Sequence, residues 1–239
     1  MTLCRGGLGQ AFRLTARVRS SFPGYYRPSD QEFALLWREA TFVFDASVLL
    51  NLYGYSTGTR GLFLDAVSQL GERVWLPWQF AEEYQRNRLK SIQEQVKHHA
   101  DVEKALRQVH DQHFASKSRH PFISAAALRS FTKLRKTIAQ GRSEHEALFS
   151  RDPYFERVSD LFSGRVGRTP TSEALEEMHV EAAKRLKAQV PPGFCDLKDK
   201  GEPGAYGDYI GWREVLNHAK SRSCSVVLVD RFCDVPASV

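Results

Sequence analysis

The segment Thr41–Asn51 constrains the fold of this 239-residue chain more than any other part of it. It begins with the apolar, β-prone run TFVF, reaches Asp45, and continues into an apolar helix start. A continuous hydrophobic run is typical of a buried parallel strand, and open α/β sheets bind ligands at the carboxyl ends of such strands. This segment alone leaves Asp45 with two interpretations, the N-cap of a helix or a ligand of a metal ion.

Three further acidic positions occur in similar local contexts. Residues 73–77 read as a second strand, and the helix predicted from Trp78 onwards carries Glu82 and Glu83. Asp208 lies near the start of a helix predicted over 206–220, and Asp230 ends a hydrophobic strand predicted over 225–229. Adjacent helix positions diverge by about 100°, so only one of the two glutamates can face the strand ends, and spacing does not choose between them. Asp208 has the alternative role of a charge that stabilises the helix N-terminus.

Two strands that end in Asp and two acidic helix starts would bring four carboxylates together at one edge of the sheet. These carboxylates would repel one another. Two like charges about 4 Å apart repel by roughly 4 kcal/mol at an effective dielectric constant of 20, so such a cluster requires a shared proton or a hard cation. Ligand sets made only of oxygen favour Mg²⁺ or Mn²⁺ over zinc.

Several blocks of sequence resemble the PIN-like domain family, in its bacterial branch with a large helical insert. They are FPGYYRPSDQEFALLW, FVFDASVLLNLYGYS, VWLPWQFAEEYQRNR, PPGF followed by YGDYIGW, and VVLVD, which span about residues 21 to 230. The resemblance implies a three-layer α/β/α sandwich with a parallel sheet, and an Mg²⁺- or Mn²⁺-dependent nuclease that hydrolyses RNA. It places the catalytic metal ligands at Asp45, Glu83, Asp208 and Asp230. It also places Ser47 and Asn51 near the metal.

The chain departs from the family pattern after Asp230. Arg231 stands where the family usually has a Thr-Asp-Asp type of tail, and the sequence ends at Val239. Family members usually continue through a further helix and strand, so we expect a C-terminally truncated form. The alternative function is therefore a catalytically impaired PIN-like protein that binds nucleic acid or a protein partner.

The positive charge of the chain is concentrated in two regions. The net charge is +6, residues 1–29 contain five Arg and no acid, and residues 86–142 contain 13 Lys and Arg against 4 Asp and Glu. A basic region beside an acidic site suits a nuclease, although a solvated helical face is the plain alternative. We expect Arg86, Arg88 and Lys90 to contact the phosphate backbone. RNA is the expected partner, with DNA as the alternative substrate, and a protein inhibitor and a second copy of the chain are further candidates.

The remaining pattern predicts one domain over residues 21–239, with a basic, disordered leader at 1–20 and a helical insert at about 90–190. No Gly or Pro interrupts residues 78–120, which predicts one long helix, broken near His110–His113. Further helices are predicted over 124–140, over 144–162, and from Pro170 at an N1 position to about residue 190. No run of 18 apolar residues predicts a membrane span, and four scattered cysteines fit a cytoplasmic protein.

Overall fold

The computed structural model of the chain describes residues 18–22, 25–114, 124–193 and 200–230, and it falls into two compact units that divide after Ala40. The first unit contains α2 (Asp30–Glu39), which starts with a capping box. The Glu32 N–H donates to Ser29 Oγ, while Glu32 Oε2 accepts from the Ser29 N–H at 2.7 Å. The hydrogen bonds that the Ser29 N–H and the Ser29 hydroxyl donate to Glu32 Oε2 lower the pKa of the Glu32 carboxyl. Of the expected leader, residues 1–17 lie outside the described residues and residues 18–20 are helical.

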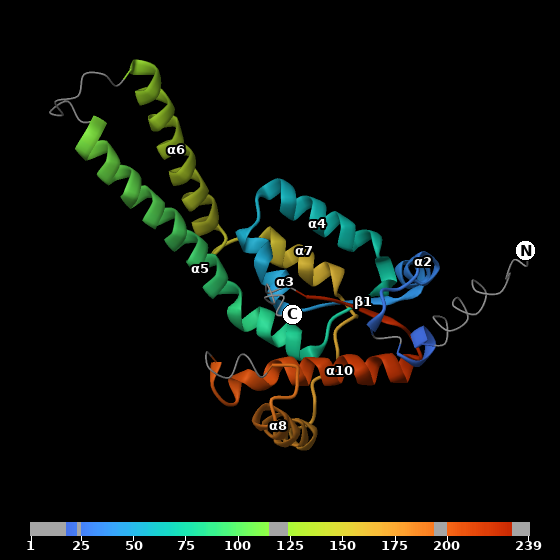
Figure 1. Cartoon of the computed structure of the whole chain (residues 1–239). Helices are drawn as coiled ribbons and strands as arrows, with labels where there is room; N and C mark the ends of the chain where they lie inside the picture. Colours follow the sequence, from blue (N-terminus) through green and yellow to red (C-terminus); the bar gives the residue numbers. More distant parts are fainter. Residues whose placement is uncertain (1–17, 23–24, 115–123, 194–199, 231–239) are drawn as a thin grey trace, which may run out of the picture. The chain divides into compact units, whose positions relative to one another are not determined.

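The second unit is built on a parallel sheet with the strand order β2-β1-β3 (Figure 1). Its strands are β1 (Thr41–Phe44), β2 (Val74–Trp75) and β3 (Val226–Val229). The central strand β1 has partners on both sides, and its Phe42, Val43 and Phe44 are at most 3% exposed. This burial explains the continuous apolar run. The strand predicted over 73–77 is shorter than expected, because Leu76 leaves β2 and pairs with Val166 in an isolated bridge.

Helices cover both faces of this sheet, which gives the α/β/α architecture expected from the sequence; in Figure 1, α4 and α7 lie on one side of the strands and α10 on the other. They are α3 (Ala46–Leu50), α4 (Thr57–Gln69), α5 (Trp78–Val109), α6 (Ala125–Ala147), α7 (Pro153–Leu161), α8 (Ser172–Lys187) and α10 (Gly207–Arg222). Short 3-10 helices occur at η2 (Asn51–Gly54), η3 (Gly71–Arg73) and η6 (Gly204–Tyr206), and a π-helical turn occurs at η4 (His110–Phe114). No helix in the described part of the chain is both long enough and apolar enough to cross a membrane.

The main hydrophobic core surrounds β1. The Phe44 ring makes edge-to-face contacts with Phe63 of α4 at 6.1 Å and with Phe162, just after α7, at 5.9 Å between ring centroids. A smaller core cluster, which includes Leu186 and Ile210, joins α8 to α10. Although α7 falls within the residues predicted as an insert, its Val158 belongs to the main core.

Helices α5 and α6 form a hairpin that projects away from the sheet (Figure 1). The long helix α5 gives way to a π-helical turn at His110–Phe114, which confirms the predicted break. The predicted helix over 144–162 is wrong. Helix α6 ends at Ala147 and α7 begins at Pro153, because the Asp152 side chain caps α7 by accepting from two backbone N–H groups. Pro170 does not occupy N1 either, since Thr171 is the N-cap of α8.

Helix α10 approaches α5 closely through glycine. A Cβ added at Gly211 would lie only 2.0 Å from Cε1 of the buried Phe80 ring on α5. One turn earlier, a Cβ at Gly207 would lie 3.3 Å from Gln79 Nε2. The two glycines are four residues apart on one helix face, so they let the backbone of α10 lie against α5. This contact sets the position of α10 beside the start of α5.

Candidate metal centre

Asp45 and Asp230 lie side by side at the carboxyl edge of the sheet. Phe44 and Val229 are partners in the β1–β3 ladder, and the Asp45 N–H donates to the Val229 carbonyl at 2.9 Å. The residue after each strand therefore falls at the same level. Asp45 is partly buried, whereas Asp230 is exposed.

Asp45 is also the N-cap of α3, so one of its two interpretations from sequence is realised. Its Oδ2 accepts from the Ser47 N–H at 2.8 Å. Within the described residues, no hydrogen bond or ion pair engages the other carboxylate oxygen, Oδ1. A capping carboxylate uses one oxygen for the helix, so the cap and a metal-binding role are compatible.

Glu83 and the first turn of α10 form a second acidic group. A Cβ at Gly207, the residue before Asp208, would lie 3.8 Å from Glu83 Oε2. Only residues 223–225 link α10 to β3, so α10 runs back along the strand and places Asp208 towards the carboxyl edge. The structure turns Glu83 towards α10, whereas Glu82 forms an ion pair with Arg86 at 3.2 Å. Lys200 Nζ lies 3.8 Å from Glu83 Oε1.

The register thus sets Asp45 beside Asp230, and Glu83 lies beside Gly207, the residue before Asp208. Among the residues that the structure describes, no three His, Cys, Asp or Glu side chains converge closely enough to hold a metal ion. The chemistry of the donors nevertheless fits a hard cation, since all four are carboxylates. Ser47 Oγ, two residues from Asp45, is buried and has no hydrogen-bond partner in the described structure. A buried hydroxyl without a partner is costly, and a bound ion or its water would satisfy it.

Glu214 is a residue of this region that the sequence did not single out. Helix α5 begins after Pro77, which has no capping side chain, and Glu214 of α10 supplies the missing acceptor. The Gln79 N–H donates to Glu214 Oε2 at 3.0 Å. Burial raises the pKa of the Glu214 carboxyl to about 7, against the lowering effect of the backbone N–H groups of Gln79 and Trp78.

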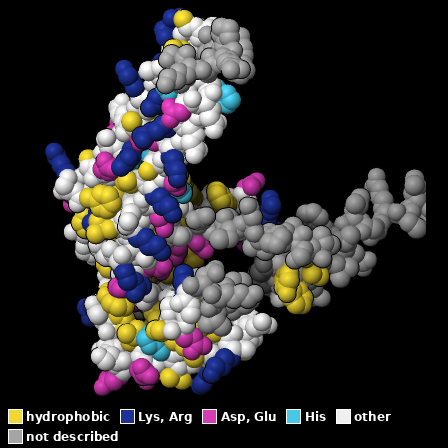
Figure 2. All heavy atoms as spheres, turned by 90° about the vertical axis from the view of Figure 1, so that its left-hand side faces the viewer, with side chains coloured by type: hydrophobic (Ala, Val, Ile, Leu, Met, Phe, Trp, Pro, Cys, Tyr) yellow, Lys and Arg dark blue, Asp and Glu magenta, His cyan; other side chains and the backbone are white. Residues whose placement is uncertain are grey.

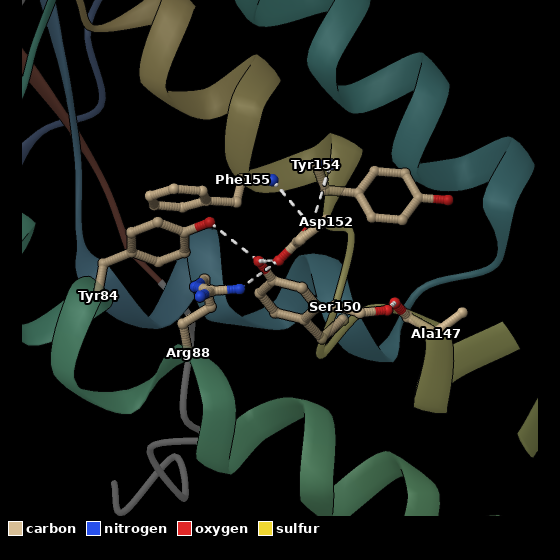
Figure 3. A network of polar contacts seen from close by, with 8 residues as sticks. Tyr84, Arg88, Ala147, Ser150, Asp152, Tyr154 and Phe155 are labelled. Carbon is tan, nitrogen blue, oxygen red and sulfur yellow. Dashed lines mark hydrogen bonds and ion pairs between the residues drawn. The ribbon is translucent and has the colours of Figure 1, made fainter. Parts of the chain in front are cut away.

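The three expected phosphate contacts have different surroundings. Arg86 and Lys90 are exposed on α5, and Arg86 pairs only with Glu82 among the ion pairs of the described residues. Arg88, by contrast, points inwards. Its Nη1 lies 2.7 Å from Asp152 Oδ2, its guanidinium stacks over the Phe155 ring, and its side chain is 18% exposed (Figure 3). We therefore leave Arg88 out of the proposed RNA contacts.

Arg88 belongs to a buried polar network around Asp152 (Figure 3). The Tyr53 hydroxyl donates to Asp152 Oδ2 at 2.7 Å and lies 3.1 Å from the Tyr84 hydroxyl. Burial raises the pKa of the Tyr53 hydroxyl strongly and that of Tyr84 to about 12, so both stay protonated at neutral pH. The network joins η2, α5 and the start of α7 at the base of the hairpin.

A parallel sheet between helices, with acidic residues at its carboxyl edge, defines the chain as an α/β/α domain with an acidic candidate site. The family described as PIN like domain matches residues 41–231. Because the match covers most of the sequence, the chain belongs to the PIN-like domain family, as its sequence blocks indicated. Searches of curated proteins and of solved structures each found no match.

Proposed function

We propose that this PIN-like protein is a metal-dependent ribonuclease. The observation that carries the proposal is the register of β1 and β3, which sets Asp45 beside Asp230 with the unsatisfied Ser47 hydroxyl close by in sequence. Glu83, which lies beside Gly207, and Asp208, the next residue of α10, would supply the remaining carboxylates.

Mg²⁺ or Mn²⁺ bound at these carboxylates would supply activation of water and stabilisation of the charge that develops on the phosphate. Asp45 would hold the ion with the oxygen that α3 does not use, and Glu83, Asp208 and Asp230 would complete the ligand set. Arg86 and Lys90 would attract the phosphate backbone, because both are exposed and lie four residues apart on one face of α5.

The test is cleavage of labelled single-stranded RNA with Mn²⁺ or Mg²⁺, with and without chelator, by the wild type, Asp45→Asn and Asp160→Asn. Asparagine is as good an N-cap as aspartate, so Asp45→Asn removes the charge while α3 keeps its cap. Asp160→Asn makes the same chemical change at an exposed position of α7.

We expect Asp45→Asn to lose cleavage with an unchanged melting temperature, and Asp160→Asn to cleave as the wild type does. Cleavage that survives in chelator, or in Asp45→Asn, would rule out this mechanism. RNA binding without cleavage under any metal condition would instead support the alternative function of a binding module. A parallel assay with single-stranded DNA decides which nucleic acid is the substrate.

A further inference from the structure

Three basic side chains form a line along α6. Arg129, Lys133 and Lys136 follow an i, i+4, i+7 spacing, which places them on one face of the helix, and we call them the α6 basic stripe. All three are exposed. In the described part of the chain, none of them takes part in an ion pair.

The positive potential of the stripe is not cancelled by nearby acids in the sequence. Between Asp111 and Glu144 the chain has seven Lys and Arg and no Asp or Glu. Arg142, near the end of α6, is compensated instead: it lies 3.4 Å from Glu103 and 2.9 Å from Glu146. Figure 2 shows Lys and Arg side chains spaced along the projecting hairpin, with fewer acidic side chains between them.

The stripe lies far from the candidate metal centre. The Phe131 ring stacks against Phe114 at 4.6 Å and against His110 at 6.2 Å between centroids, so the stripe is level with the end of α5. Glu83 lies near the other end of α5. A helix rises 1.5 Å per residue, which makes the separation along α5 from Glu83 to His110 roughly 40 Å.

An exposed line of basic side chains without ion-pair partners in the described structure suits an extended polyanion, because a small anion would require a pocket or converging donors. We propose that the α6 basic stripe binds the sugar-phosphate backbone of RNA, so that one RNA strand spans from the carboxylate edge to the hairpin. At about 3.4 Å per stacked nucleotide, such a strand needs roughly 12 nucleotides. The proposal rests on the proposed function in taking RNA as the ligand and the carboxylate edge as the other end of the bound strand.

The test measures binding by fluorescence anisotropy in the Asp45→Asn background, which prevents cleavage of the probes. The probes are single-stranded RNAs of about 6 and about 30 nucleotides, chosen to fall below and above the required span. The stripe variant replaces Arg129, Lys133 and Lys136 with Gln. The control variant replaces three exposed lysines outside the hairpin with Gln, namely Lys184, Lys187 and Lys220.

Three lost contacts to a single strand should reduce the slope of log affinity against log salt by about 2. The stripe variant should therefore bind the long RNA more weakly than the control variant does. The ratio of the control variant's affinity to the stripe variant's affinity should fall by roughly fifteen- to twentyfold between 50 and 200 mM salt. The short RNA should bind both variants equally. Equal salt slopes for the two variants on the long RNA, or an equal loss on the short RNA, would overturn the proposal.

Cleavage assays separate this proposal from the proposed function. With an intact Asp45, the stripe variant should show a raised KM for the long RNA and an unchanged kcat. If no variant cleaves RNA but the length-dependent salt slope holds, the stripe proposal stands and the nuclease proposal fails. If cleavage depends on Asp45 while the stripe and control variants bind alike, the reverse is true.

Discussion

The Lys200 ammonium lies 3.8 Å from Glu83 Oε1. Glu82, one position earlier on α5, faces Arg86 instead. The two neighbouring glutamates therefore differ in direction and in the charge that compensates them. This difference makes their roles separable by experiment.

We predict that Glu83→Gln weakens Mn²⁺ binding at least about tenfold, which corresponds to roughly 1.4 kcal/mol, whereas Glu82→Gln has little effect. Lys200→Gln should tighten Mn²⁺ binding, because it removes a positive charge beside a proposed ligand. Calorimetric titration with Mn²⁺ measures all three. Equal effects of the two glutamate substitutions would show that neither residue is a specific ligand.

Arg88 and Arg86 should affect different properties. Arg88→Gln removes one partner of the buried pair with Asp152, so it should lower the free energy of unfolding by about 3–5 kcal/mol. Arg86→Gln removes an exposed ion pair and should cost less than about 1 kcal/mol. Urea denaturation measures both. A small effect of Arg88→Gln would mean that the network in Figure 3 contributes little to stability.

Gly211→Ala should destabilise the protein, because the new methyl group would lie 2.0 Å from Phe80 Cε1. Overpacking of this kind costs about 1–3 kcal/mol, which outweighs the gain of up to about 1 kcal/mol in helix propensity. Gly61→Ala is the matched control: it lies inside α4, and a Cβ there would meet nothing within 4 Å. It should leave stability unchanged or raise it. If both substitutions stabilise the protein, the close contact between α10 and α5 is not tight.

Glu214 should make the stability of the protein depend on pH. Burial raises its pKa from the ordinary 4.5 to about 7, so folding favours the protonated carboxyl. Its contribution is fully present below pH 4.5 and is lost as the pH rises through 7. The melting temperature of the wild type, measured relative to that of Glu214→Gln, should therefore fall across this interval and be level above it. A difference that stays constant with pH would contradict the assignment.

The sequence predicted the parts of the fold that depend on local pattern. The apolar run before Asp45 identified the central strand, and the absence of Gly and Pro after Trp78 identified α5. The boundary between α6 and α7 was missed although Asp152-Pro153 was a visible signal, since Asp favours an N-cap and Pro favours N1.

Contacts between distant residues were beyond the sequence pattern. Arg88 and Asp152 are 64 positions apart, and nothing local to Arg88 indicates that its guanidinium turns inwards. The same holds for Glu214, which caps a helix that starts 136 positions earlier at Trp78. The paired glycines 207 and 211 were a readable signal of close helix packing, but only the fold shows that α5 is the partner.

The order of the four candidate ligands along the sequence has a consequence for synthesis of the chain. Asp45 and Glu83 are made early, whereas Asp208 and Asp230 belong to the last described helix and strand. At about 5–20 residues per second, a ribosome needs about 6 to 25 s to proceed from Glu83 to Asp208. During this interval the nascent chain carries only half of the proposed site, while it is close to its own messenger RNA. Under the proposed function, cleavage would have to wait until β3 pairs with β1.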